Sequence, residues 1–201
     1  ENAAPYPLSL EAGERVNITT SPTIADGIAV GKPGELNFEI IKRTVDSVVT
    51  VSDDDTSRAL VMLLERAKLV VEPAGAVGVA AAMTGKLHID GPTVILLSGG
   101  NIDPMVMERV ISRGLVASQR YLRVHIPLPD RPGQLARIAE LIAEANANVV
   151  EVLHTRHGTG LDISQVAIDI HMETRGAEHA ELVLARLREA GYSPSVGTGT
   201  D

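Results

Sequence analysis

Apolar and polar residues alternate most clearly in the part of the chain after residue 120. Leu122–Leu128 and Val166–Met172 place an apolar residue at every second position, which is typical of strands with one buried face and one open face. Helical spacing of apolar residues separates these strands. The expected strands and helices cover residues 122–128, 135–145, 148–156, 166–172, 180–187 and 192–196. Their order, β-α-β-β-α-β, predicts a ferredoxin-like domain over residues 119–201.

Residues 1–118 show a different pattern. Val94–Leu97 is a run of four apolar residues without alternation, which predicts a parallel strand buried on both faces. Ser47–Val51 is a second, shorter strand candidate, and helices are expected at 34–43, 73–83 and 104–117. Strands that alternate with helices indicate a layered α/β sheet. The sequence therefore predicts an α/β protein with two domains, 1–118 and 119–201.

The end of the expected strand at Val94–Leu97 is the first candidate site. Ser98-Gly99-Gly100-Asn101 ends the strand, and Asp103-Pro104 is typical of a helix start. Open α/β sheets bind ligands at the carboxyl ends of their strands, so Ser98 lies where a ligand is expected. The alternative is an ordinary glycine turn.

Two further segments carry candidate chemistry. Gly27 permits a close approach of the backbone to a ligand, or it belongs to a simple Asp-Gly turn. Glu72 is either the acid of a helix start or an acid of a site. Asp53–Asp55 suggests a metal site, but three acids before a helical segment favour a helix N-terminus instead.

Composition narrows the range of partners. The net charge is −8, and it divides into −5 for residues 1–119 (10 basic and 15 acidic groups) and −3 for residues 120–201 (8 and 11). With no basic face, one Phe and three Tyr, nucleic acid is not an expected partner. The chain has no cysteine, which is compatible with a reducing cytoplasm, and no apolar run long enough to span a membrane.

Four motifs stand in one order along the chain: Thr23–Gly27, Glu72–Ala76, Leu97–Asn101 and Asp130–Gly133. Together they resemble the C-terminal part of a threonine dehydratase (threonine ammonia-lyase) that ends in an ACT regulatory domain. The resemblance covers essentially the whole chain. It implies pyridoxal 5′-phosphate as the cofactor and the conversion of L-threonine to 2-oxobutanoate and ammonia by β-elimination.

The resemblance also assigns expected roles to cofactor-site residues. Ser98 matches a serine that hydrogen-bonds the pyridine nitrogen of the cofactor, and Gly99 follows it in the same motif. Gly27 matches a glycine whose backbone lies beside the cofactor ring, and Glu72 matches an acid near the cofactor. A neutral hydroxyl holds the ring nitrogen protonated less strongly than a carboxylate does, so it restrains the electron sink.

The lysine that this family links to the cofactor, in a Ser-Phe-Lys context, is expected before residue 1. The chain contains only Lys32, Lys42, Lys68 and Lys86, and none stands in that context. We therefore expect the chain to begin within a larger protein and to be catalytically inactive alone.

No metal is expected in either domain. Some relatives bind a cation through two acids near this start, but only Glu1 matches, since Pro7 replaces the second acid. On a strand, His154 and His157 would point to opposite faces, so they are not expected to share a metal unless the strand ends between them.

By resemblance, the ACT domain pairs edge to edge with a second copy and binds an amino acid between protomers. Isoleucine or valine is the expected effector. The candidate residues are Asp130, Gly133, Gln134 and Leu135, at a helix start whose backbone N–H groups suit a carboxylate. The alternative is a capped helix without a ligand.

Two other functions remain open at this point. The chain could be a non-catalytic amino-acid sensor in which Ser98 and Glu72 are vestigial. A nucleotide-binding α/β protein is disfavoured because no G-x-G-x-x-G motif follows a strand. Residues near the methyl group of the substrate are expected upstream, so L-threonine and L-serine are both candidate substrates.

Overall fold

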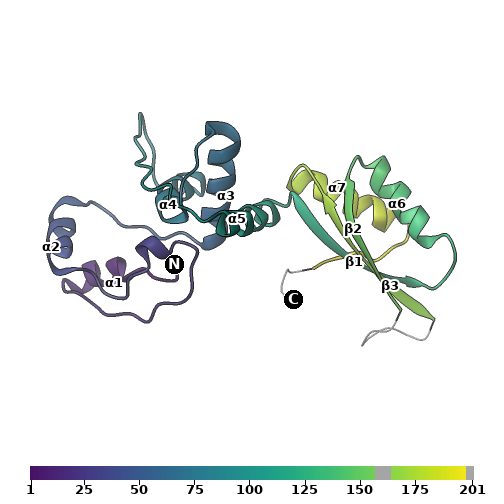
Figure 1. Cartoon of the computed structure of the whole chain (residues 1–201), viewed down its shortest axis with the longest axis horizontal. Helices are drawn as coiled ribbons and strands as arrows, with labels where there is room; N and C mark the ends of the chain where they lie inside the picture. The colour runs from purple at the N-terminus through teal and green to yellow at the C-terminus, as the bar shows by residue number, and fades with distance from the viewer. Residues whose placement is uncertain (157–163, 198–201) are drawn as a thin grey trace. The chain divides into compact units, whose positions relative to one another are not determined.

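The computed structural model describes residues 1–156 and 164–197. The chain divides into two compact units, Glu1–Ala117 and Ser118–Asp201 (Figure 1). The helices are α1 (Pro5–Ala12), α2 (Glu35–Thr44), α3 (Asp53–Met62), α4 (Pro73–Met83), α5 (Pro104–Ala117), α6 (Gln134–Glu144) and α7 (Ala177–Glu189), with a 3-10 turn η1 at Asp26–Ile28 and a π turn η2 at Leu63–Ala67. The strands are β1 (Tyr121–Pro129), β2 (Asn148–Thr155), β3 (Gln165–Glu173) and β4 (Ser195–Val196). None of these helices is long and apolar enough to cross a membrane.

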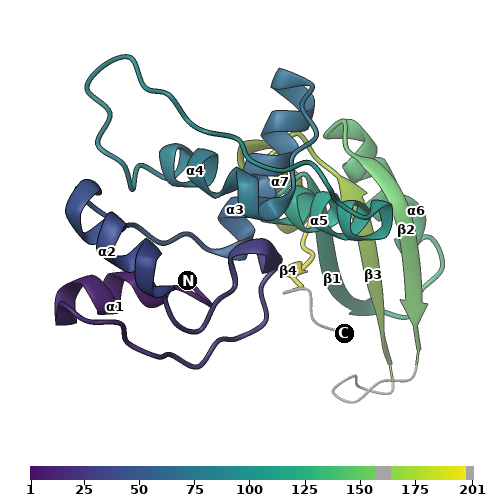
Figure 2. The ribbon, with the colours of Figure 1, turned by 60° about the vertical axis from the view of Figure 1, so that its left-hand side comes forward.

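The core of the first unit lies where α4 and α5 pack against α3. Its buried side chains are Ala59, Leu60, Leu63, Val71, Ala76, Val79, Ala80 and Val110. The helices approach closely because α5 has a glycine at the contact: a methyl group at Gly114 would lie 2.7 Å from the backbone oxygen of Ser57. Helices α1 and α2 lie side by side (Figure 1, Figure 2), and Lys42 Nζ donates to the Gly13 oxygen at 2.8 Å.

Helix α3 begins as the acid-rich sequence predicts, with Asp53, Asp54 and Asp55 in its first turn. Ser52 is the N-cap: its hydroxyl accepts from the Asp55 N–H at 3.1 Å, and the Asp55 carboxylate accepts from the Ser52 N–H at 3.3 Å. Burial opposes ionisation of Asp55. The hydrogen bonds with Ser52 and the guanidinium of Arg58 outweigh that effect and hold the pKa of Asp55 below its usual range.

The strands expected at Ser47–Val51 and Val94–Leu97 do not form; within the first unit, residues 1–117, no strand is present. Residues 93–99 form neither a helix nor a strand, and no strand of the first unit lies beside them. Only one side of the apolar run is covered: Ile95 and Leu97 pack against the core, whereas Val94 is 96% exposed and Leu96 83% exposed. A run of apolar residues predicts burial on both faces, but a ladder also requires adjacent strands to pair with.

The second unit confirms the β-α-β-β-α-β order. Its antiparallel sheet has the strand order β2-β3-β1-β4, with Val124 opposite Ile170 and Val196. Helices α6 and α7 cover one face (Figure 1). The inward residues of β1 and β3 alternate as the sequence predicts, and they form one core with apolar residues of α6 and α7. The last strand is shorter than the expected 192–196, because only Ser195 and Val196 pair with β1.

A buried histidine joins the two helices of this unit. His179 of α7 is 7% exposed. Its Nε2 lies 2.6 Å from the backbone oxygen of Ala145, at the end of α6, and its Nδ1 accepts from the Arg175 N–H at 3.0 Å. These two contacts require the proton on Nε2, because Nδ1 must be free to accept. The imidazole thus satisfies two backbone groups that the fold would otherwise leave unpaired.

Candidate functional site

Three of the expected cofactor-site residues, from distant parts of the chain, lie together in the first unit. The backbone N–H of Glu72, the N-cap residue of α4, donates to the Gly99 oxygen at 3.2 Å. A Cβ at Gly27 would lie 3.5 Å from Glu72 Oε1 and 3.2 Å from the Ala74 side chain. A Cβ at Gly99 would overlap the Glu72 carboxylate. The half-buried carboxylate therefore lies between two glycine backbones.

The two glycines permit this approach for different reasons. Gly99 has φ +75°, a left-handed conformation that favours glycine, and a side chain there would overlap Glu72. Gly27 lies in the 3-10 turn η1, where the Ile28 N–H donates to Ala25 at 3.2 Å and the Ala29 N–H donates to Asp26 at 3.0 Å. Gly27 permits the approach because it has no side chain that would crowd Ala74 of α4.

Ser98 is exposed, so the hydroxyl that the sequence singles out is accessible and not inside a packed interior. Its backbone is held closely by α4: a methyl group at Gly75 would overlap the Ser98 oxygen and lie 2.8 Å from the Ser98 carbonyl carbon. The preceding Leu97 packs against the core. Ser98 is thereby fixed in place by its own main chain and by its neighbour.

A cavity of about 690 Å³ opens beside these residues. It is lined by Thr23, Ile24, Asp26, Gly27, Glu72, Pro73, Asn101, Ile102, Asp103, Pro104 and Val106. Gly27 and Glu72 are thus part of the wall, whereas Ser98 and Gly99 precede the wall residue Asn101 without lining the cavity themselves. The volume is within the range of ligand pockets for small organic molecules.

The helix that follows the Ser98 segment begins as the sequence predicts. Asp103 Oδ1 accepts from the N–H groups of Met105 at 2.8 Å and Val106 at 3.3 Å, and Pro104 is the first residue of α5. Asp103 therefore caps the helix that forms one wall of the cavity.

None of the four lysines of the chain lines this cavity. Lys42 donates to the backbone oxygen of Gly13, and Lys86 donates to that of Thr50. Lys86 also forms an ion pair with Glu1 at 2.9 Å. Lys68 donates to the Glu65 oxygen at 2.8 Å. Lys32 is not among the lining residues. The cavity thus contains acidic and amide groups of this chain but no amine.

The expected effector residues of the second unit lie at the start of α6, where their roles differ. Gly133 is the N-cap with φ +90°, and no side chain caps the helix. Leu135 is exposed. Gln134 Oε1 accepts from the Tyr192 hydroxyl at 3.0 Å. Asp130 forms an ion pair with Arg156, and its N–H donates to Ser164. The expected set of free N–H groups therefore excludes that of Asp130.

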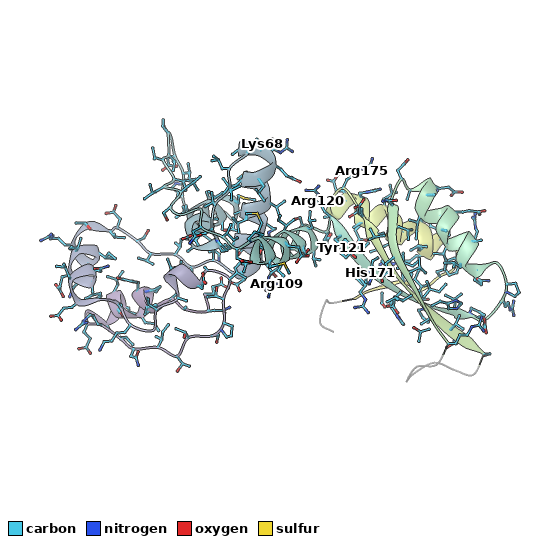
Figure 3. All side chains as sticks on the ribbon, viewed as in Figure 1. Lys68, Arg109, Arg120, Tyr121, His171 and Arg175 are labelled. Carbon is cyan, nitrogen blue, oxygen red and sulfur yellow. The ribbon has the colours of Figure 1, made fainter. Side chains whose placement is uncertain are left out.

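A second polar cluster, on the open face of the sheet, was not predicted. Tyr121 and His171 meet edge to face with ring centroids 5.8 Å apart (Figure 3). Nδ1 of His171 lies 3.1 Å from Glu151, and its buried Nε2 has no hydrogen-bond partner in the described residues. One row along, His125 Nδ1 lies 3.1 Å from Asp169. Strand alternation indicates which residues face outward, but only the registers of β1 and β2 against β3 show which of them meet.

No group of three or more His, Cys, Asp or Glu side chains able to hold a metal ion occurs in residues 1–156 and 164–197. Of the two histidines considered from the sequence, His157 lies outside the described residues. The expectation of no metal stays a prediction.

Two family models match the chain, one in each unit. Residues 1–99 match "Pyridoxal-phosphate dependent enzyme", and residues 123–191 match "ACT domain". The first match contains Gly27, Glu72, Ser98 and Gly99. The chain thus joins part of a catalytic domain of the pyridoxal-phosphate-dependent enzymes to an ACT domain.

Relatives narrow this assignment. The chain is 46% identical to L-threonine ammonia-lyase of Geobacter sulfurreducens over 92% of this chain and 46% of that protein. It is 42% identical to L-threonine ammonia-lyase of Thermotoga maritima over 96% of this chain and 48% of that protein. This chain is therefore a homologue of the L-threonine ammonia-lyases, as the ordered motifs indicate. It spans about half the length of these curated relatives.

One solved structure adds support at the level of the fold. The processed form of threonine deaminase isoform 2 from Solanum lycopersicum is 31% identical and superposes with a TM-score of 0.51, covering 56% of this chain and 34% of that one.

Proposed function

We propose that this chain is part of a pyridoxal-phosphate-dependent lyase that converts L-threonine to 2-oxobutanoate and ammonia, with L-serine as a second candidate substrate. The observation that supports the proposal most strongly is the meeting of Gly27, Glu72 and Gly99 beside a cavity of about 690 Å³, next to Ser98. The family match and the two L-threonine ammonia-lyase relatives support the same reaction.

The residues present fit a flat heteroaromatic cofactor. Gly27 lies in the cavity wall and has no side chain that would project from it, whereas Gly99, outside the wall, lets the Glu72 carboxylate approach closely. A planar ring packs best against backbone without side-chain bulk, so the Gly27 backbone suits one face of a ring. We assign the exposed Ser98 hydroxyl to the ring nitrogen and Glu72 to a polar group near the ring.

When bound, pyridoxal phosphate supplies an electron sink for the charge that develops on the α carbon of the substrate. The role of this chain is to orient that group and tune it. The Ser98 hydroxyl donates a neutral hydrogen bond, so it stabilises positive charge on the ring nitrogen less than a carboxylate would. A restrained sink suits β-elimination, because the hydroxyl group departs promptly. Glu72 holds its position through its own N–H bond to the Gly99 oxygen.

The amine that reacts with the cofactor is not supplied by this chain in our proposal. None of its four lysines lines the cavity, and the three described above are engaged elsewhere. We therefore propose that residues 1–201 alone are inactive, and that the full-length protein supplies the amine.

We further propose that the second unit binds an amino-acid effector, isoleucine or valine, at the uncapped start of α6, and that the protein is a homo-oligomer. The support is the ACT match together with a helix N-terminus that no side chain caps. Cysteine-free composition is compatible with a cytoplasmic location, which we include in the proposal.

Ser98 offers the sharpest test of this function. In the full-length protein, Ser98→Ala should retain the visible absorbance of bound cofactor but lose turnover of L-threonine by about 100-fold, the scale seen when one catalytic hydrogen-bond donor is removed. Ser98→Thr, which keeps a hydroxyl on an exposed residue, is the matched control and should lose much less. Unchanged turnover in Ser98→Ala would contradict the role assigned to Ser98.

A further inference from the structure

Asp53 connects the start of α3 to a loop 30 residues earlier in the chain. Its Oδ1 accepts from the Thr23 hydroxyl at 2.5 Å, and its Oδ2 accepts from the Ile24 N–H at 3.2 Å. Thr23 Oγ1 in turn accepts from the Ala25 N–H at 3.2 Å. One half-buried carboxylate thus organises three consecutive residues of the loop.

The helix does not need Asp53 as its cap. Ser52 and Asp55 form the complete capping box of α3. The exposed Asp54 pairs with Arg113 of α5, with 2.7 Å between Arg113 Nε and Asp54 Oδ1. The three consecutive acids therefore have three separate roles, and only Asp53 contacts the loop.

The loop held by Asp53 forms one wall of the candidate cofactor cavity. Thr23 and Ile24 line the cavity, and the chain continues through the buried Ala25 into η1, where Gly27 lies against α4. Asp53 itself does not line this cavity. Any effect of Asp53 on a ligand there must therefore act through the position of the loop.

We infer that Asp53 is a positioning residue, which fixes loop 23–28 so that the Gly27 backbone forms the wall of the cofactor cavity. We call the hydrogen bonds from Thr23 and Ile24 to Asp53 the clamp. The effect of the clamp on cofactor binding rests on the proposed function, whereas the clamp itself does not. Hydrogen bonds to an ionised carboxylate are about twice as strong as neutral ones, and here two of them act on adjacent residues. Release of the loop would allow the wall residues to shift, and a displacement of about 1 Å is enough to weaken binding and reactivity.

The test compares Asp53→Asn with Asp54→Asn in the full-length protein. Both variants remove one charge from the first turn of α3, so they alter the helix dipole interaction similarly. In Asp53→Asn, the amide group cannot accept from both donors, because its nitrogen must face one of them. Hydrogen exchange of the amides of Ile24, Ala25, Ile28 and Ala29 should accelerate by about tenfold. The dissociation constant of pyridoxal phosphate should rise by a similar factor. Asp54→Asn should change neither.

Thr23 provides a second route that leaves α3 intact. Thr23→Val replaces the hydroxyl with a methyl group of similar size and should accelerate exchange of the same amides. Thr23→Ser keeps the hydroxyl donor and should preserve their protection. These two variants keep the inference testable if Asp53→Asn does not fold.

The outcomes separate the clamp from the proposed function. Exchange in Asp53→Asn and Thr23→Val that equals the wild-type rate overturns the clamp, whatever the cofactor does. Faster exchange with unchanged cofactor affinity overturns the positioning role. A wild-type protein that binds no pyridoxal phosphate refutes the proposed function, while the exchange result still decides whether Asp53 holds the loop.

Discussion

Replacement of Gly75 by alanine should displace the backbone of Ser98 and thereby disturb the candidate site. Gly75 is the third residue of α4, and a methyl group there would overlap the Ser98 oxygen and lie 2.8 Å from the Ser98 carbonyl carbon. It would also lie 2.9 Å from Val71 Cγ1. Non-bonded carbons are optimally separated by about 3.5–4.0 Å, so these two carbon–carbon distances are too short by roughly 0.6–1.2 Å. The overlapped group is main chain, which cannot rotate away as a side chain can.

Overpacking of this kind costs about 1–3 kcal/mol, while alanine gains up to about 1 kcal/mol over glycine inside a helix. We expect a net loss of about 1–2 kcal/mol in the free energy of unfolding for Gly75→Ala. The larger consequence concerns function, because relief of the overlap requires Ser98 and Gly99 to move by about 1 Å, a displacement that can cost about 100-fold in rate.

Gly78→Ala is the matched control on the same helix. Its methyl group would lie 3.0 Å from Ile95 Cγ2, the end of a side chain that can shift. This variant should be neutral or more stable by up to about 1 kcal/mol, from helix propensity alone. Urea unfolding followed by circular dichroism measures both free energies, and titration with pyridoxal phosphate measures the effect on the site.

The reasoning is refuted if Gly75→Ala is as stable as Gly78→Ala and binds the cofactor with wild-type affinity. Such a result would mean that the contact between α4 and the Ser98 backbone does not fix the site. Reduced stability with wild-type cofactor affinity would separate packing from positioning and contradict the second part of the prediction.

Two further predictions concern stability. Because the folded-state pKa of Asp55 is lowered, its carboxylate stabilises the fold above the unfolded pKa of about 3.9, and this contribution is lost as pH falls through the folded pKa. Asp55→Asn should therefore lower the free energy of unfolding by about 1 kcal/mol at neutral pH. In urea unfolding at several pH values, the difference in this free energy between variant and wild type should close below about pH 4. A difference that does not depend on pH contradicts this prediction. His179→Phe leaves the Ala145 oxygen and the Arg175 N–H unpaired, so it should lower the free energy of unfolding by about 2–4 kcal/mol, measured by thermal unfolding. The control is His154→Ala at an exposed residue, which should cost less than about 0.5 kcal/mol. Equal losses in the two variants would show that the buried contacts of His179 contribute little.

The second unit could be predicted from the sequence because its pattern is redundant. Apolar residues at every second position of β1 and β3 identify the buried face, and the helical spacing of α6 supplies the layer that covers it. The pattern of each element therefore predicts the same buried side of the sheet as the patterns of its neighbours do. Among the elements in the described residues of this unit, the short β4 departs most from the expectation, because two residues pair where a five-residue strand was expected.

The first unit shows the limit of a hydrophobic run as a signal. Residues 94–97 are apolar enough for a central strand, yet Val94 and Leu96 are exposed because no strand of residues 1–117 lies beside them. Apolarity indicates that a segment prefers burial, but strand formation depends on partners distant in the sequence. The helix starts at Pro73 and Pro104 were predicted because caps and first-turn prolines are local features.

Local patterns single out Ser98, Gly27 and Glu72 as separate candidates, but that they belong to one site could be predicted only by resemblance. No pattern in the sequence places Gly27, Glu72 and Gly99 in contact, since they come from three segments separated by more than 20 residues. The role of Asp53 was also hidden: three consecutive acids predict a helix start, and nothing local distinguishes the one that reaches Thr23. Long-range hydrogen bonds of this kind become visible only in three dimensions.

The central claim is that these residues belong to a pyridoxal-phosphate-dependent lyase acting on L-threonine. The most direct measurement is the production of 2-oxobutanoate and ammonia from L-threonine by the purified full-length protein, with and without added pyridoxal phosphate. We predict equal amounts of the two products, formed only when the cofactor is present. A protein that binds no pyridoxal phosphate, or that binds it and leaves both L-threonine and L-serine unchanged, would contradict the claim.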